Sequence, residues 1–208
     1  RSSASARPLS PGPGSTLMSC LRPRVDRMSI DSLWDPGVQQ DVFRLLLEAT
    51  SRPGRIYDLS PILDDTPAFM AILATLVDKG VTLHDETRGL RQREHNVLQT
   101  VPEDAGKANF ILASGVQPPE FKPAIGSLES PETGATLILT IAALGQGQMH
   151  MTCTGPGIED RHRFQVQGLH PGWIQARKNW NAWFPLGVDI YLVDATQVSA
   201  LPRTTCTA

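Results

Sequence analysis

The apolar positions between residues 37 and 50 recur at spacings of three and four, the repeat of one buried helix face. These positions are Val38, Val42, Leu45, Leu46 and Ala49. The pattern predicts a helix that stops at Pro53-Gly54, since proline and glycine both interrupt helices. A short strand is expected next, over residues 56–59.

A second amphipathic pattern follows Thr66-Pro67, which is typical of a helix start with Thr66 as N-cap and Pro67 at the first helical position. Gly80 is expected as its C-terminal cap. A strand over residues 81–83 should follow. The polar stretch 87–100 is predicted to be a further helix with few apolar anchors.

Strands dominate the second half of the pattern. Residues 135–144 form a near-continuous apolar run, which predicts one strand covered on both faces of a sheet. Gly145-Gln146-Gly147 then reads as a hairpin turn. Residues 118–131 are expected to be loop with one short helix at most. Further strands are expected at 110–112, 149–154, 164–166, 188–193 and 198–201, and a tryptophan-bearing helix at 172–183.

This order of elements predicts a single α/β domain over residues 28–208, with a mixed sheet covered by helices. Hydrophobic residues make up 40% of the 208 residues and charged residues 19%, as in soluble globular proteins. No apolar run approaches the roughly 20 residues of a membrane helix. The three cysteines are widely spaced without a CxxC pair, which fits a reducing cytosol.

The charge is unevenly distributed along the chain. Residues 1–27 contain five arginines and one aspartate, a net charge of +4, so the remainder carries −6 of the total of −2. The arm 1–27 is rich in Ser, Pro, Gly and Arg, and is expected to be a disordered extension, with Met28 as a natural start. A transit-like or regulatory arm is the alternative. The acidic body argues against general nucleic-acid binding, and an anionic substrate would need a few local cations.

The C-terminal run Pro202-Arg203-Thr204-Thr205 carries one candidate anion contact. A guanidinium beside two hydroxyls suits the oxygens of a phosphate or phosphonate. The alternative is a surface arginine in a fraying tail. The two interpretations differ in whether Arg203 points into a cleft or into solvent.

Three other positions have both a functional and a structural interpretation. Glu132 is either a loop residue or an interface carboxylate. Gly155 and Gly157 let the backbone come close either to an anion or to a neighbouring strand, and turns favour the second. Asp64 either complements the charge at a helix start or joins a polar site.

Motifs that would make the chain an autonomous enzyme are missing from the sequence. It has no Walker A loop, no GxGxxG and no serine nucleophile elbow, and its four lysines have no cofactor context. Alternation along a strand points His150 and Cys153 to opposite faces, which argues against a paired metal or Cys–His site. We therefore expect no metal and no cofactor.

Five segments, in order, resemble the PhnH family of the bacterial carbon–phosphorus lyase system. They are residues 41–54 (DVFRLLLEATSRPG), 131–139 (PETGATLIL), 155–158 (GPGI), 184–189 (FPLGVD) and 202–205 (PRTT). Thr50 stands where the family usually has Met, and Val188 where it has Ile.

The resemblance implies more than the residues alone. It implies a reduced version of the fold of PLP-dependent transferases, without PLP or its lysine. It also implies a cytoplasmic homodimer that joins PhnG, PhnI and PhnJ, with PhnL needed for activity. The complex would transfer the ribose 5-triphosphate part of ATP to an alkylphosphonate, with release of adenine, and this subunit would be required for that step. The iron–sulfur chemistry that breaks the C–P bond would belong to PhnJ.

Three interpretations stay open for the chain itself: a subunit that mainly organises the complex, an autonomous PLP-type enzyme, and a pure interaction module. Trp173, Trp180 and Trp183 suit an interface and equally suit a core.

Overall fold

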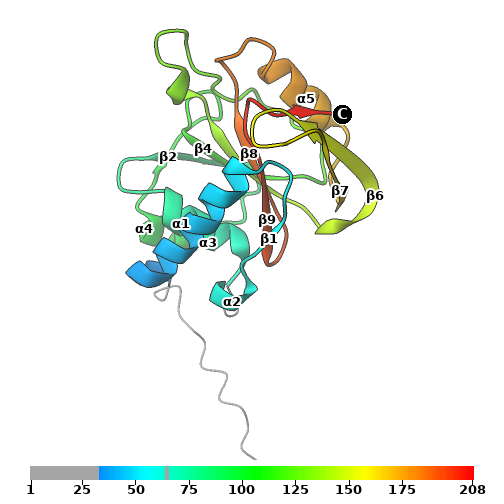
Figure 1. The fold of residues 1–208 in the computed structure, drawn as a ribbon. Coiled ribbons are helices and arrows are strands. Elements are labelled where there is room, and N and C mark those ends of the chain that lie inside the picture. The colour runs from blue at the N-terminus through cyan, green and yellow to red at the C-terminus, as the bar shows by residue number, and fades with distance from the viewer. Residues whose placement is uncertain (1–32, 64–65) are drawn as a thin grey trace, which may run out of the picture.

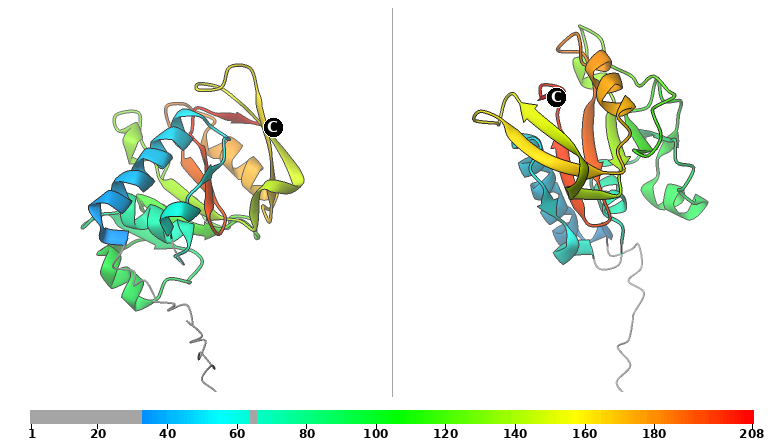
Figure 2. Two further views of the ribbon diagram at one scale, coloured as in Figure 1. Left: turned by 60° about the horizontal axis from the view of Figure 1, so that its bottom comes forward. Right: turned by 90° about the vertical axis from the view of Figure 1, so that its right-hand side faces the viewer.

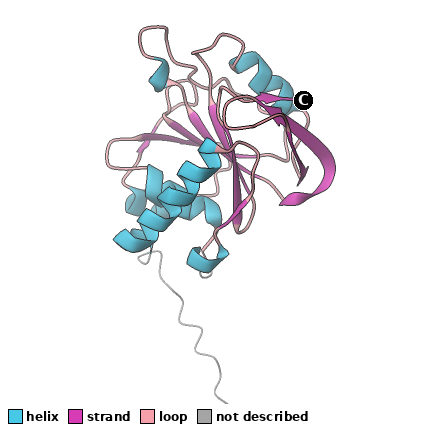
Figure 3. Ribbon diagram, viewed as in Figure 1, coloured by secondary structure: helices cyan, strands magenta, loops and turns pink. Residues whose placement is uncertain are grey.

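The computed structural model describes residues 33–63 and 66–208, which form two β-sheets with helices (Figures 1 and 3). The large sheet has the order β1-β9-β8-β5-β4-β2-β3 and the small sheet the order β10-β6-β7. The large sheet consists of β1 Tyr57–Asp58, β2 Thr82–Asp85, β3 Val101–Pro102, β4 Phe110–Ser114, β5 Thr136–Thr140, β8 Asp189–Val193 and β9 Gln197–Leu201. The small sheet consists of β6 Ala143–Thr154, β7 His162–Gln167 and β10 Cys206–Thr207.

The large sheet is mixed. Strands β3, β2, β4, β5 and β8 run parallel, whereas β9 and β1 are antiparallel to their neighbours. The expected α/β class with a mixed sheet is therefore confirmed.

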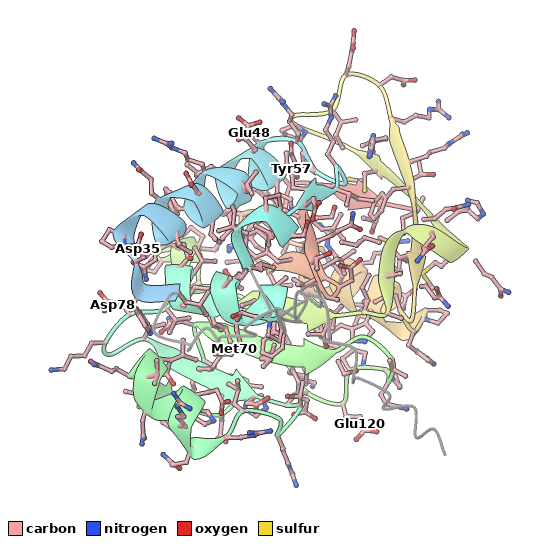
Figure 4. All side chains as sticks on the ribbon, turned by 90° about the horizontal axis from the view of Figure 1, so that it is seen from below. Asp35, Glu48, Tyr57, Met70, Asp78 and Glu120 are labelled. Atoms are coloured by element: carbon pink, nitrogen blue, oxygen red, sulfur yellow. The ribbon has the colours of Figure 1, made fainter. Side chains whose placement is uncertain are left out.

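The first predicted helix is confirmed as α1, Pro36–Ser51. The Asp35 carboxylate caps it, accepting the backbone N–H of Gly37 at 2.8 Å. Figure 4 shows Asp35 at one end of the helix and Glu48 near the other, beside Tyr57. The Tyr57 hydroxyl donates to the carbonyl of Glu48 at 3.3 Å, which ties α1 to the first strand.

The second predicted helix has different ends from those expected. It is α3, Ala68–Leu76, preceded by a one-turn helix, α2, Ser60–Leu63. Pro67 occupies the cap position and no side chain caps the helix, so the expectation of Thr66 as N-cap was wrong. The backbone N–H of Ala68 instead donates to the carbonyl of Ala195, in the turn between β8 and β9, at 3.1 Å. Gly80 lies in the turn beyond the helix and does not cap it.

Two apolar clusters lie on the two faces of the large sheet. On one face, Leu112, Ile138 and Val193 of the central strands pack with α1, α3 and α4, Gln92–Leu98. On the other, Leu137 and Leu139 pack with Trp173 of α5, Gly172–Trp180, and with the inner face of the small sheet. Figure 2 shows the N-terminal helices on one side of the large sheet and α5 on the other.

The expected continuous strand over residues 135–144 is interrupted. The Ile141 N–H still bonds the carbonyl of Val193 in the large sheet, whereas the Ala142 N–H bonds Gln167 in the small sheet. The chain therefore passes from the large sheet to the small sheet between the consecutive residues Ile141 and Ala142. Ile141, Ala143 and Leu144 are buried and only Ala142 is exposed, which is why the apolar run showed no boundary.

The expected hairpin at Gly145-Gln146-Gly147 was also wrong. These residues form a bulge inside β6, where Leu144 and Met149 both lie opposite Val166. Gly147 has φ +120°, and a Cβ there would collide with the carbonyl of Val166. The hairpin between β6 and β7 instead spans residues 155–161.

The parallel part of the large sheet contains a topological switch between β2 and β4. The connection after β2 runs through α4, whose Leu98 joins the core on the α1 face. The connection after β4 covers residues 115–135, and its Phe121 and Ala124 pack on the opposite face. Connections that leave adjacent strands in opposite directions open a crevice at the carboxyl ends of the strands.

Candidate functional site

Arg203 points into the protein and pairs with Asp189 at the start of β8. Its Nη2 and Nε donate to one Asp189 carboxylate oxygen at 2.6 and 3.1 Å, and the Arg203 backbone N–H donates to the other oxygen at 2.7 Å. Nη1 donates to the carbonyls of Pro131 at 2.7 Å and Pro185 at 3.4 Å. The side chain is 15% exposed. The guanidinium therefore joins three segments and has its charge compensated.

The neighbours of Arg203 do not converge on a common ligand position. Glu132 lies in a 3-10 helix, Pro131–Thr133, with an exposed side chain, and Thr204 is exposed as well. Thr205 is 2% exposed, and its hydroxyl has no hydrogen-bond partner among the described residues. Anion contact by these residues stays a prediction, and the geometry gives Arg203 a positioning role.

The two glycines of the 155–157 turn contact backbone. Gly155 has φ +130°, and a Cβ there would lie 2.9 Å from the carbonyl of Thr204. Gly157 has φ +82°, and a Cβ there would collide with the carbonyl of Ser51. This close approach matches the structural interpretation of the glycines, although Gly157 also borders a cavity. Asp64 lies outside the described residues.

A second buried arginine holds the C-terminal segment. Arg177 of α5 is 3% exposed, and its Nη2 donates to the carbonyls of Pro202 at 2.6 Å and Thr205 at 2.9 Å. Burial lowers the pKa of Arg177, an effect that Cys153 and Asp189 oppose. Burial raises the pKa of the Cys153 thiol to about 11, against a smaller lowering by Arg177.

The cations that face a concave surface lie elsewhere. A cavity of about 720 Å³ is formed between β6, β7 and the segment before β1. Two arginines and two histidines line it together with uncharged residues, and no carboxylate is among its lining residues. We call it the basic cavity; its lining residues are Arg55, Ile56, Gly145, His150, His162, Arg163, Phe164 and Gln165.

A second cavity of about 340 Å³ adjoins the basic cavity and shares Arg55 and His162 with it. The Gly157 turn lines this second cavity, together with Arg52 and Arg161. Both of these arginines have carboxylate partners, Arg52 with Glu48 at 3.2 Å and Arg161 with Asp160 at 3.4 Å. Within the described residues, no ion pair engages Arg55 or Arg163, so these two are the cations available to an anion.

Sequence reasoning missed Arg55, Arg163 and Arg177. Arg55 and Arg163 meet only in the folded protein, because the basic cavity combines segments about 90 to 110 residues apart. Arg177 is likewise defined by its contacts with Pro202 and Thr205 and not by a local motif. One signal was available for part of it: alternation along β7 places Arg163 and Gln165 on the same, outer face as His150 of β6, where polar residues recur at every second position.

His150 and Cys153 do point to opposite faces of β6, since His150 is exposed and Cys153 is buried. Within residues 33–63 and 66–208, no three His, Cys, Asp or Glu side chains gather as a group able to hold a metal ion. No helix in the same ranges has the length and apolar character required to cross a bilayer.

Comparison with known proteins finds one family along the described part of the chain. The family model described as bacterial phosphonate metabolism protein (PhnH) matches residues 33–208. The putative C-P lyase subunit protein HtxG of Stutzerimonas stutzeri is 40% identical over 173 residues, which cover 83% of this chain and 87% of the relative. The alpha-D-ribose 1-methylphosphonate 5-triphosphate synthase subunit PhnH of Rhizobium meliloti (strain 1021) is 28% identical over 177 residues, covering 80% and 88%.

Proposed function

Because the chain belongs to the PhnH family of bacterial phosphonate metabolism proteins, we propose that it is a subunit of a carbon–phosphorus lyase system. Its step is the transfer of the ribose 5-triphosphate part of ATP to an alkylphosphonate with release of adenine. The observation that carries the proposal is the match along residues 33–208, together with two relatives whose names give a C-P lyase subunit and a triphosphate synthase subunit.

The finer parts of the proposal follow the family resemblance. The chain acts in the cytoplasm as a homodimer that joins PhnG, PhnI and PhnJ, with PhnL needed for activity. Its fold is a reduced form of the PLP-dependent transferase fold that works without PLP. The mixed sheet with helices on one face and α5 on the other is consistent with such a descent.

The basic cavity supports a direct contact with the anionic substrates. Its lining carries Arg55 and Arg163 and no carboxylate, in a body whose net charge is negative. A concave surface of one charge sign concentrates counter-ions and orients them. We assign Arg163 and Arg55 to the phosphate or phosphonate oxygens, and Arg203 to holding the fold around Asp189.

Three exposed apolar side chains support a role in assembly. Leu128 is 77% exposed, Trp183 76% and Phe184 68%. They lie on two loops that Arg203 joins through Pro131 and Pro185. Exposed aromatic residues are enriched where proteins meet, so this surface is our candidate contact with another subunit. Trp173, by contrast, is 2% exposed and belongs to the core.

The test is reconstitution from purified subunits. With PhnG, PhnI and PhnL present, adenine release from ATP and methylphosphonate should depend on this chain, and the chain should co-purify with PhnI. Trp183→Ala should weaken co-purification, whereas Trp173→Phe, at a core position, should leave it intact. Adenine release that is equally fast without the chain would refute the proposal.

An autonomous PLP-type enzyme makes the opposite prediction. The purified chain alone would show a pyridoxal absorbance or turn over substrate. None of the lysines lines the basic cavity or the cavity beside it, which favours the subunit interpretation.

A further inference from the structure

The crevice at the topological switch contains a further concave surface, formed by other segments than those that carry the arginines of the basic cavity. A cavity of about 350 Å³ lies at the carboxyl ends of β2 and β4. Its wall on one side comes from Glu86 and Thr87, directly after β2. The other side comes from Ser114 and the connection that follows β4. We call it the switch crevice; it is lined by Glu86, Thr87, Ser114, Gln117, Pro118, Pro119, Glu120, Phe121 and Trp173.

The position of the switch crevice in the sheet is one where α/β proteins bind ligands. In open α/β sheets, ligands bind outside the carboxyl ends of strands where the strand order reverses. Here β3 lies on one side of β2 and β4 on the other, and the two connections leave on opposite faces. The backbone N–H of Glu86 donates to the carbonyl of Leu112 at 2.9 Å, which fixes the start of the crevice against β4.

The aromatic wall of the crevice is held in place. The Trp173 indole N–H donates to the carbonyl of Gln117 at 2.7 Å, which anchors the connection to α5. The Phe121 ring lies 6.0 Å from Trp173, edge-on, and 6.2 Å from Trp180, stacked. Phe121 and Trp173 line the crevice and Trp180 supports Phe121 from behind the lining, so the crevice has a preformed apolar wall of the kind that lines small-molecule sites.

The His84 ring connects the aromatic side of the crevice with Glu86 on its polar side. The His84 ring lies 6.0 Å from Phe121, with Nδ1 3.0 Å from the carbonyl of Glu103 and Nε2 3.0 Å from the Glu86 carboxylate. Both partners are acceptors, so the ring donates to one or both of them according to which of its nitrogens carries a proton. In the part of the chain that the structure describes, no hydrogen bond uses the other oxygen of Glu86.

The chemistry of the lining selects the ligand class. No lysine or arginine lines the switch crevice, and Glu86 and Glu120 would repel a phosphate or phosphonate. Carboxylate oxygens, the Ser114 hydroxyl and an amide suit a ligand that offers several hydroxyl donors, whereas the Thr87 hydroxyl already donates to Asp85 and accepts from the Gly89 N–H. One oxygen of Glu86 contacts His84, which leaves the other to accept from a ligand hydroxyl, and the flat Phe121 ring favours a cyclic ligand.

We propose that the switch crevice binds an uncharged ring compound with vicinal hydroxyls, a free sugar or a nucleoside, with Glu86 accepting from its hydroxyls. The inference stands on the crevice and is independent of the proposed function. The crevice, whose lining has no lysine or arginine, and the basic cavity, whose lining has two arginines, are separate sites for different ligands.

The experiment uses the full chain labelled with ¹⁵N, titrated with D-ribose, adenosine and ethanolamine. The Trp173 indole N–H signal, assigned with Trp173→Phe, should shift with ribose or adenosine and stay fixed with ethanolamine. A shift with adenosine alone identifies a nucleoside site, and equal shifts identify a sugar site. Glu86→Gln should weaken binding about tenfold, as expected for loss of a charge-assisted hydrogen bond.

Glu129→Gln is the matched control, because Glu129 is an exposed carboxylate on the same connection outside the crevice lining. Ser114→Ala provides a second variant if Glu86→Gln does not fold. No shift of the Trp173 signal with either sugar-containing probe would overturn the inference. So would unchanged affinity in the crevice variants, or a shift with ethanolamine alone. Failure of reconstitution with intact adenosine binding would count against the proposed function only.

Discussion

Arg203 and Asp189 are held together by three hydrogen bonds, two from the guanidinium and one from the Arg203 backbone N–H. Asp189 begins β8 in the middle of the large sheet, and Arg203 follows β9 at the end of the same hairpin. The same guanidinium reaches Pro131, so the segment before β5 is fixed as well. One ion pair therefore fixes the entry to two central strands.

Replacing Arg203 with Ala should lower the free energy of unfolding by about 2 kcal/mol, because it leaves the Asp189 carboxylate, which is 33% exposed, without its charged partner. Urea unfolding measures the loss. Arg161→Ala is the control: Arg161 pairs with Asp160 in solvent, and the loss should be within about 1 kcal/mol. A stable, assembled Arg203→Ala protein with reduced turnover would instead identify Arg203 as a substrate contact.

Arg177→Met should cost about 3 kcal/mol, because the carbonyls of Pro202 and Thr205 lose their donor in the interior. Lys178→Met, at the exposed next position of α5, should have little effect on urea unfolding. Equal stability of the two variants would contradict the role given to Arg177.

Gly157→Ala should destabilise the protein more than Gly80→Ala. Both glycines have nearly the same positive φ, +82° and +90°, so both substitutions carry the backbone cost of about 1 kcal/mol. Only at Gly157 would the new Cβ meet a neighbour, the carbonyl of Ser51, whereas Gly80 has open space around it. The clash should add about 1–3 kcal/mol. Thermal unfolding of both variants measures the difference, and equal costs would refute a tight turn at Gly157.

Cys153 should be protected from thiol reagents in the native protein, because its pKa of about 11 keeps it protonated and its side chain is buried. In a Cys20→Ser background, Ellman's reagent should modify the exposed Cys206 at once and Cys153 only on unfolding. Rapid modification of two thiols at pH 8 would contradict this.

The same shift makes a prediction about alkaline pH. The unfolded thiol loses its proton near pH 9 and the folded one near pH 11, so the folded state binds more protons in between. The stabilisation is complete below pH 9 and is lost as the pH rises toward 11, by at most about 1.4 kcal/mol per pH unit. Cys153→Ala should show a shallower decline than the parent over this range.

Arg163→Gln should reduce adenine release in the reconstituted system at least about tenfold while the chain still assembles, as expected for loss of a charged hydrogen bond to an anion. The parent chain should also bind inorganic triphosphate with an affinity that falls as salt is raised. Arg93→Gln, on α4 and outside the basic cavity, is the matched control. If Arg163→Gln leaves both turnover and triphosphate affinity unchanged, the proposal that the basic cavity contacts the anion is refuted.

The sequence was sufficient where a local pattern decided the structure. The stripe through Val42, Leu46 and Ala49 predicted α1, because burial of one helix face repeats every three to four residues. The residues of β4, β5, β8 and β9 were likewise readable as apolar runs. The change of sheet after Ile141 could not be predicted from the sequence, because the residues on both sides of it are apolar.

The candidate site depended on contacts that no local pattern records. Arg203 was identified as a notable cation, but its pairing with Asp189 depends on the β8–β9 hairpin register. The basic cavity combines Arg55 with residues of β6 and β7 far along the chain. The helix start at Ala68 was missed for the same reason, because its donor is satisfied by Ala195.

The segment held by the two buried arginines has a consequence for biosynthesis. Residues 201–208 supply the carbonyls that Arg177 binds, the partner of Asp189 and the strand β10 that pairs with β6. A ribosome makes the chain from its N-terminus, so β1 to β9 are synthesised before this segment emerges. Translation that stops near residue 200 should therefore yield a product in which β6 has lost its neighbour β10 and Asp189 its cation, prone to aggregation and proteolysis rather than partly functional.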